Sequence, residues 1–371
     1  MENNQNRSIA MKTRMLFVLM SIAAVALFWH STGCKKNPVA PEPRNLSWSV
    51  DTLAHPDNWQ VSISDIWASS AKDVYAAGSA NTTRGILWHY DGNRWRDIKI
   101  SITEGGPITG AINFRDIYGF GPNDVWVVGD RLERNPNAPP NYFFHSLIVH
   151  YDGSGWHEIP SPPGNEINVV WGRSPDDVWF GGVNGTLFHY DGVSVKKDSL
   201  PLDIPPDISG GVYNTLSITG NESESYMLLA DFNSKPNRYF LLELLNDKWV
   251  VRDSTFYFNS TNLWLSPWGT LYAPGNWTYY RNNGIWDVLL PGSSTLWSKG
   301  VFGTRPDNYF VTGRSNVAPY PGAVYHFNGS DWSSLPELQK LDNDYYDVWT
   351  DGSEVFIVAV SGNGSMVYHG K

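Results

Sequence analysis

A seven-residue motif recurs along the chain and constrains its fold more than any other feature. It reads HYDGNRW from His89 and HYDGSGW from His150. HYDGVSV begins at His189, and a diverged copy, HFNGSDW, begins at His326. A second motif precedes the first three copies, as DIWASSAKDVYAAG, DIYGFGPNDVWVVG and VVWGRSPDDVWFGG. Two motifs that recur in the same order indicate one repeated structural unit.

The unit can be followed to the C-terminus. It returns near Trp264, Phe302 and Trp349, and a diverged copy, SITGNESESYMLLA, lies between Trp171 and Trp264. From Trp67 to Trp349 the period is about 47 residues, which gives seven units. Each unit holds four short strand-like segments, and four-stranded repeats of about 40–50 residues are typical of β-propeller blades. We therefore predict an all-β fold, a seven-bladed β-propeller with four antiparallel strands per blade.

The first motif predicts the turn between the third and fourth strands. We expect Asp-Gly, or Asn-Gly in the diverged copy, to adopt the positive φ angles of a tight hairpin. The aromatic residue three positions later, as at Trp95 and Trp156, should open the fourth strand and pack against the next blade. The last unit stops at MVYHGK without a fourth strand. We expect residues 46–53, around Trp48, to supply that strand and close the ring without an open edge.

The N-terminus carries the only cysteine of the chain. The apolar run Met15–Trp29 follows a basic stretch and is followed by HSTGC. Its 15 residues are few for a membrane span and suit a secretory signal. The segment resembles a bacterial lipoprotein signal, which implies cleavage before Cys34 and acylation of that residue, although Ser31 stands where such signals usually have Leu. The alternative is an uncleaved membrane anchor.

The predicted organisation has three parts: a signal peptide over residues 1–33, an extended Pro-rich tether over 34–45 and the propeller over 46–371. A single thiol excludes intrachain disulfides. The chain has 27 Lys and Arg against 37 Asp and Glu, a net charge of −10. Such a surface repels phosphate backbones, so no nucleic-acid partner is expected.

The repeats resemble those of bacterial secreted proteins with tandem SPxDVWAVG and HYDGxxW units, in the broad group of kelch-like and WD40-like propellers. The resemblance covers about residues 46–371 and implies a fold rather than an activity. The sialidase Asp-box, S-x-D-x-G-x-x-W, is not present, because Asp and Gly are adjacent in this motif.

No catalytic residue, metal site or cofactor is predicted. HExxH, GxSxG and P-loop motifs are missing from the sequence. The repeated histidines, His89, His150, His189 and His326, belong to different blades and cannot converge on one metal ion. We expect each imidazole to bond to an aspartate or backbone group of its own blade.

Two groups of residues are candidates for binding. The first comprises polar residues at equivalent places in the first strands: Asp65, Asp116, Asn262 and Asp347. If they face the axis, they form a channel ring able to hold a cation or a sugar hydroxyl. The alternative is that they bond to the backbones of neighbouring strands.

The second group lies in the long connections between second and third strands, Asp130–Phe144 and Arg314–Gly322. Long loops on a rigid scaffold often carry binding sites. The alternative is that they only cover the blades. The candidate ligand-binding residues in these loops are Arg131, Arg134, Tyr142, Arg314 and Tyr320.

The favoured function is a non-catalytic binding or scaffold lipoprotein. It would be a monomeric propeller, exported and anchored to the bacterial membrane through a lipid on Cys34, and would recognise a protein or glycan at the cell envelope. The alternative is a carbohydrate-active enzyme, a glycosidase or lyase, with its site at the channel mouth. Two carboxylates about 5–10 Å apart in an open pocket would favour that alternative.

Overall fold

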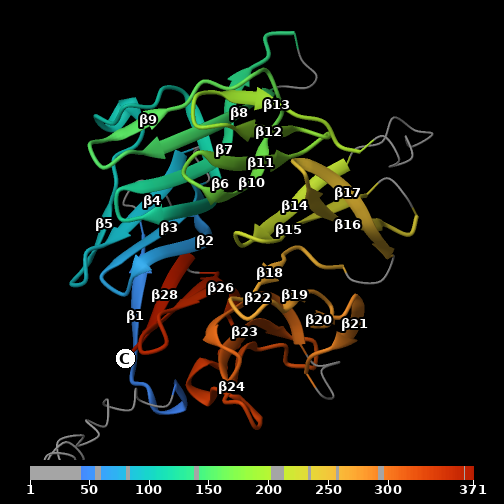
Figure 1. Ribbon diagram of the computed structural model, residues 1–371. Helices are drawn as coiled ribbons and strands as arrows, with labels where there is room; N and C mark the ends of the chain where they lie inside the picture. The colour runs from blue at the N-terminus through green and yellow to red at the C-terminus, as the bar shows by residue number, and fades with distance from the viewer. Residues whose placement is uncertain are drawn as a thin grey trace, which may run out of the picture. The chain divides into compact units, whose positions relative to one another are not determined.

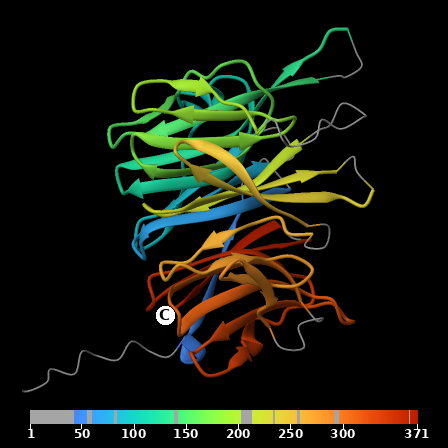
Figure 2. The same ribbon diagram turned by 45° about the vertical axis from the view of Figure 1, so that its right-hand side comes forward.

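The computed structural model describes residues 43–54, 60–80, 84–137, 142–201, 213–232, 235–255, 259–290, 296–362 and 364–371. This part of the chain forms seven four-stranded antiparallel sheets that follow one another around a ring (Figures 1 and 2). The predicted all-β, seven-bladed propeller is confirmed. The predicted signal peptide, with Cys34 and most of the tether, lies outside the described residues.

Blades one to six run from an innermost to an outermost strand in chain order, whereas β1 supplies the outermost strand of blade seven. Blades one to three comprise β2 Val61–Ser70, β3 Asp73–Ala80, β4 Arg84–Tyr90, β5 Trp95–Asp97, β6 Ala111–Gly121, β7 Asp124–Arg134, β8 Tyr142–Tyr151, β9 Trp156–Glu158, β10 Ile167–Ser174, β11 Asp177–Gly182, β12 Leu187–Tyr190 and β13 Val195–Lys197. Blades four and five comprise β14 Tyr213–Gly220, β15 Ser225–Asp231, β16 Arg238–Leu245, β17 Lys248–Thr255, β18 Trp264–Leu265, β19 Leu271–Ala273, β20 Tyr279–Asn282 and β21 Ile285–Val288. Blades six and seven comprise β22 Leu296–Arg305, β23 Asn308–Ser315, β24 Gly322–Phe327, β25 Trp332–Ser334, β26 Asp344–Thr350, β27 Val355–Ser361, β28 Gly364–Gly370 and β1 Trp48–Leu53.

Helix is confined to three 3-10 segments of three residues each within the described ranges: Pro43–Asn45, Ile102–Glu104 and Pro336–Leu338. None of these described helices is long and apolar enough to cross a membrane. The second strands are apolar at successive positions, as in β7, because neighbouring blades cover both faces of each sheet. Trp126 of β7 and Trp179 of β11 are consequently buried.

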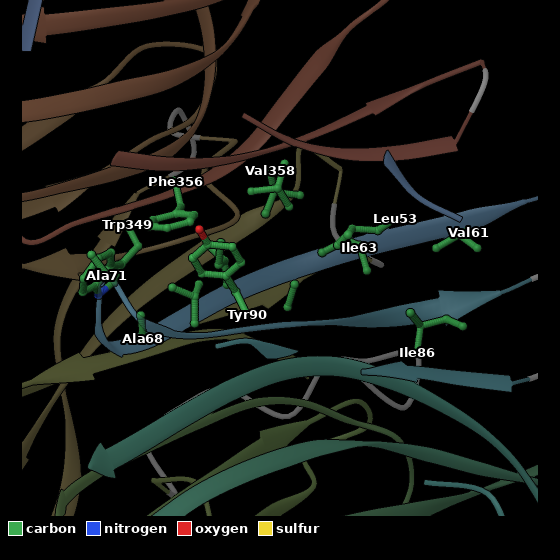
Figure 3. Packing of buried hydrophobic residues seen from close by; sticks show 14 of the residues in the cluster. Leu53, Val61, Ile63, Ala68, Ala71, Ile86, Tyr90, Trp349, Phe356 and Val358 are labelled. Carbon is green, nitrogen blue, oxygen red and sulfur yellow. The ribbon is translucent and has the colours of Figure 1, made fainter. Parts of the chain in front are cut away.

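The ring closes between the two ends of the propeller sequence. Strand β1 pairs with β28 in an antiparallel register that runs from Trp48 opposite Gly370 to Leu53 opposite Ser365. Figure 1 shows these strands side by side, blue against red. Figure 3 shows Leu53 close to Ile63 of blade one, in the cluster that joins blades seven and one. The predicted closure by residues 46–53 is confirmed for the paired residues 48–53.

The HYDG turns differ from prediction in the role of the aspartate. Gly92 and Gly153 both have φ near 85°, but the aspartates before them are not at positive φ. Instead, Asp91 Oδ1 accepts backbone N–H bonds from Asn93 and Arg94, both at 3.0 Å. Glycine therefore supplies the backbone conformation, and aspartate satisfies the N–H groups of the turn.

The aromatic residues that open the fourth strands pack against the preceding blade, so the prediction of contact with the next blade was wrong. Trp156 of blade two lies 6.1 Å from Tyr75 of blade one, and Trp249 of blade four lies 5.4 Å from Trp179 of blade three, between ring centroids. The first residue of the outermost strand points to the sheet face that covers the preceding blade.

The ring has two faces, because antiparallel strands place alternate connections at opposite ends. We call one the loop face: it carries the connections between blades and between second and third strands, such as 316–321. We call the other the turn face: it carries the remaining turns, including those of the HYDG motifs at 91–94 and 152–155.

The predicted loop Asp130–Phe144 is largely strand. Strands β7 and β8 continue their ladder beyond the blade, to the pair formed by Arg134 and Tyr142. The backbone groups of the two segments satisfy each other in this way. Figure 2 shows the resulting hairpin projecting from blade two. The other predicted loop, Arg314–Gly322, does connect β23 to β24.

Candidate binding face and central channel

Each repeated histidine bonds within its own blade, and three of the four bond to an aspartate as expected. The Nε2 atoms of His89, His150 and His189 lie 2.6, 2.7 and 2.8 Å from the carboxylates that open their second strands. The equivalent bond in blade six joins His326 to Asn308 at 2.9 Å. Each ring also stacks on or leans against an aromatic side chain of the second strand.

A fifth member of this series was missed from the sequence. His369 of β28 lies 2.6 Å from Glu354 and stacks on Phe356. The signal was the YHG of the last unit, which lacks the usual aspartate. Within the described residues, no group of three or more His, Cys, Asp or Glu side chains is placed to hold a metal ion.

A central channel of about 690 Å³ is lined by the first strands of all seven blades. Asp65, Asp116 and Asp347 line it on three consecutive blades. Each accepts a backbone N–H of the next blade through Oδ2: from Ile117 at 3.0 Å, from Val170 at 2.7 Å and from Ile66 at 3.4 Å, respectively. Both sequence-based alternatives, a channel position and a bond to the neighbouring backbone, thus hold for these aspartates.

The four remaining blades place neutral residues at the corresponding position. Asn262 also lines the channel, and its Oδ1 accepts the hydroxyl proton of Ser217 at 2.8 Å. Val169, Ser217 and Gly300 complete the set by alignment of the repeats. The acidic residues therefore form an arc over blades seven, one and two.

Electrostatics differ between this arc and the channel mouth on the loop face. Burial raises the pKa of Asp116 and of Asp347 well above the ordinary value, and the charge of neighbouring Asp65 raises the pKa of both further. At the mouth, Arg115 pairs with Asp130 at 3.2 Å, and Lys299 pairs with Asp344 at 2.6 Å. The cations of the mouth are thus neutralised by acids outside the arc.

The loop face is marked by exposed aromatic side chains. Every aromatic residue that is exposed within the described ranges lies on this face: Tyr142, Phe143, Phe144, Phe232, Trp277, Trp297 and Tyr320. The turn face exposes aliphatic residues such as Val193 and Ile285 instead. Large aromatic side chains are the commonest anchors of binding interfaces.

The predicted ligand-binding residues divide into two kinds. The guanidinium of Arg131 forms two bonds with Glu158, at 2.9 and 2.5 Å, and Arg314 donates to the backbone oxygen of Tyr320 at 2.7 Å. These two arginines support the loop face. Arg134, Tyr142 and Tyr320 are exposed on it.

Sequence reasoning missed most of the aromatic group. Phe143 and Phe144 follow Tyr142 directly, and Trp297 is the second residue of β22, with its ring parallel to that of Tyr320 at 6.5 Å. In the sequence, such aromatic residues have the pattern of a buried strand. Their position at strand ends beyond the neighbouring blades is what exposes them.

No family model matches the sequence, and no curated protein matches it. Solved propeller structures do. YCF48 bound to a D1 peptide aligns with a TM-score of 0.59 and 15% identity, over 87% of this chain and 94% of that chain. A GH74 enzyme of Niastella koreensis aligns with a TM-score of 0.53 and 13% identity, over 85% of this chain and 53% of the enzyme.

A polysaccharide lyase of family PL25, an ulvan lyase, aligns with a TM-score of 0.52 and 10% identity, over 83% of this chain and 94% of the lyase. At these identities the likeness shows the propeller fold alone. The three proteins differ in what they do, since one is a peptide complex and two are named as enzymes of different classes.

Proposed function

We propose that this protein is an exported, membrane-anchored binding module that holds a polypeptide partner on its loop face. The observation that carries the proposal is the one-sided distribution of exposed aromatic residues. Exposed apolar side chains gathered on one surface mark interaction sites more often than chance exposure does. Aromatic rings also bury a large area for little loss of side-chain freedom.

The blade-two hairpin supports this assignment most directly. Tyr142, Phe143 and Phe144 are consecutive in β8, so their side chains alternate between the two sides of the hairpin. All three are exposed, and Phe143 remains 46% accessible. A partner that grips this hairpin would bury aromatic surface on both of its sides.

Blade six offers a second contact region across the channel mouth. Trp297 and Tyr320 present parallel rings there, and Arg314 fixes the backbone of Tyr320. Blades two and six are three steps apart in a ring of seven. A single extended polypeptide can therefore reach both regions. The peptide complex of YCF48 is a precedent for a propeller that binds a polypeptide.

Membrane anchoring through Cys34 is the second part of the proposal, and it rests on the signal-like N-terminus. The described chain begins on the turn face, where Arg44 pairs with Asp331 of the HFNGSDW turn at 3.1 Å. The described chain thus enters the propeller on the face opposite the aromatic residues. A Cys34→Ala form should lose acylation and leave the membrane fraction; unchanged labelling with palmitate would refute the anchor.

The alternative, a carbohydrate-active enzyme, has less support. A glycosidase needs two carboxyl groups that face a bound sugar with about 5–10 Å between them. Asp65 instead contacts both Asp116 and Asp347, and each of the three accepts a backbone N–H. Turnover of a polysaccharide panel, lost in Asp65→Asn, would reverse this preference.

Peptides displayed on phage test the binding proposal. Panning a random library on the propeller should enrich sequences with apolar and aromatic residues. Replacing Tyr142, Phe143 and Phe144 together by Ser should weaken these peptides about 100-fold, because each lost anchor contributes on the order of 1 kcal/mol or more.

The matched control replaces Val193 and Ile285 by Ser on the turn face, where these residues are 87% and 72% exposed. This control should bind as the unchanged protein does. Equal affinity of the triple variant and the unchanged protein would overturn the proposal.

A further inference from the structure

The three channel aspartates connect four consecutive blades. Asp347 bonds blade seven to blade one, Asp65 bonds blade one to blade two, and Asp116 bonds blade two to blade three. The first of these joints is where the ring closes, since blade seven contains both ends of the propeller sequence. The arc therefore spans the seam of the ring.

The carboxyl groups of the three aspartates are also in hydrogen-bond contact with one another. Asp65 Oδ2 accepts from the amide of Ile117, which directly follows Asp116, and the amide of Ile66, which directly follows Asp65, donates to Asp347 Oδ2. The side chain of Asp65 thus lies between those of Asp116 and Asp347, in hydrogen-bond contact with both. An ionised carboxylate only accepts hydrogen bonds, so each of these contacts requires a proton on one partner. Two protons satisfy both contacts when each outer carboxyl group carries one proton and donates it to the central carboxylate.

The backbone bonds agree with this arrangement. Asp116 and Asp347 each accept an amide N–H through Oδ2, which leaves Oδ1 to carry the acidic proton. A carboxylate at Asp65 has lone pairs for both O–H groups and for the Ile117 amide. The backbone packs closely beside the arc as well, because a Cβ at Gly300 would lie 3.1 Å from Asp347 Oδ1.

No nearby cation replaces the protons. Arg115 and Lys299 line the same channel, but their charges are taken by Asp130 and Glu166 and by Asp344. The other titratable groups on the strands that line this part of the channel are Tyr118 and Tyr346, neither of which carries a positive charge in any protonation state. Across the channel the corresponding positions are Val169, Ser217 and Asn262.

We propose that Asp116 and Asp347 are protonated in the folded protein at neutral pH and donate to the Asp65 carboxylate, forming a proton-dependent latch across the seam. Burial raises the pKa of both outer groups, in agreement with this assignment. Folding then takes up protons. The stabilising effect of the latch is full below the unfolded pKa and is lost as pH rises through the folded pKa values.

The latch is tested by infrared spectroscopy and by urea unfolding between pH 5 and pH 9. The variant Asp116→Asn/Asp347→Asn keeps both bonds of each residue, since the amide NH₂ donates where the acid O–H did. We expect the unchanged protein, but not this variant, to show the C=O band of a protonated carboxyl at pH 7.

Between the unfolded and the folded pKa values, each proton taken up on folding lowers the folding equilibrium constant about tenfold for every unit by which the pH rises. Two protons therefore lower it about 100-fold per pH unit. The double variant should lose this part of the slope. The exposed pair Asp176→Asn/Asp342→Asn is the control and should keep it. Equal pH dependence of stability in all three proteins would overturn the latch. An infrared spectrum of the unchanged protein without the carboxyl C=O band would also overturn it, and that measurement does not depend on the folding of either variant.

Discussion

The two faces of the ring are built from the same seven blades but differ in how their side chains are used. On the turn face, side chains are bonded locally: Asp91 and Asp152 each accept two backbone N–H groups of their own turns. On the loop face, aromatic side chains such as Phe143 and Trp297 project without a core to cover them. The turn face thus serves folding, and the loop face is available for binding.

This difference explains why the motifs repeat on one face only. Each HYDG turn solves the same backbone problem, so the same residues recur. The connections of the loop face vary freely, from Val183–Thr186 in blade three to the projecting hairpin of blade two. Variation is expected where the scaffold sets no local requirement and a partner sets the sequence.

The largest contrast should come from two aromatic residues of blade two. Trp126 is buried, stacks on His150 at 3.9 Å and donates to Asp124 at 3.0 Å. Trp126→Ala should reduce the free energy of unfolding by about 3–5 kcal/mol, because it leaves a cavity between blades. Phe143→Ala on the loop face should change it by less than about 0.5 kcal/mol. Urea unfolding of both variants checks this, and similar losses would erase the contrast.

Two histidines of β8, each paired with a carboxylate of β7, differ in the same way. His150 bonds to Asp124 beside the turn face, whereas His145 bonds to Glu133 at 3.0 Å on the loop face, where both side chains are exposed. We expect His150→Ala to cost about 1–2 kcal/mol and His145→Ala about 0–0.5 kcal/mol. Denaturation midpoints measure both. A larger loss from His145→Ala would mean that the projecting hairpin stabilises the fold.

A pair of glycines tests the backbone requirement of the turns. Gly153 has a φ of 85°, and a Cβ there would lie 2.9 Å from Asn123 Cβ. Gly121, in the neighbouring turn, has open space around its Cβ position. Gly153→Ala should destabilise the protein by about 1–2 kcal/mol, and Gly121→Ala should be nearly neutral. Thermal unfolding distinguishes them, and equal effects would contradict the assigned turn conformation.

The loss of stability in acid caused by one HYDG turn should be the smallest of these effects. Hydrogen bonds from Ser154 lower the pKa of Asp152 from 3.8 to about 2. Because the folded pKa is the lower one, this turn stabilises the protein above pH 3.8 and loses that effect as pH falls towards 2. Asp152→Asn should flatten the acid limb of the stability curve slightly. An unchanged limb would show that the turn carboxylate does not contribute.

The sequence predicted the fold well because the informative residues act locally. HYDG and its following aromatic mark a turn and a strand start wherever they occur, and the missing fourth strand of MVYHGK pointed to Trp48. What depends on the neighbouring blade was not predictable. The direction in which Trp156 packs, and the contact of Asp65 with two other aspartates, arise only when the ring closes.

The proposed binding surface was predictable only in outline. The long connections were visible in the sequence, but the pairing of Arg131 with Glu158 was not, since these residues meet across the outer strands of blade two. Tyr142, Phe143 and Phe144 have the composition of a buried strand. They are exposed because β7 and β8 extend beyond the rest of the blade, and no local sequence pattern indicates that extension.

Photo-crosslinking in intact cells shows most directly whether the loop face holds a polypeptide partner. A benzoylphenylalanine at Phe143 probes the loop face, and one at Val193, which is more exposed, probes the turn face. We predict a discrete polypeptide adduct from position 143 that is lost when Trp297 and Tyr320 are replaced by Ser, and no such adduct from position 193. An adduct from position 193, with none from position 143, would show that the partner does not bind on the loop face.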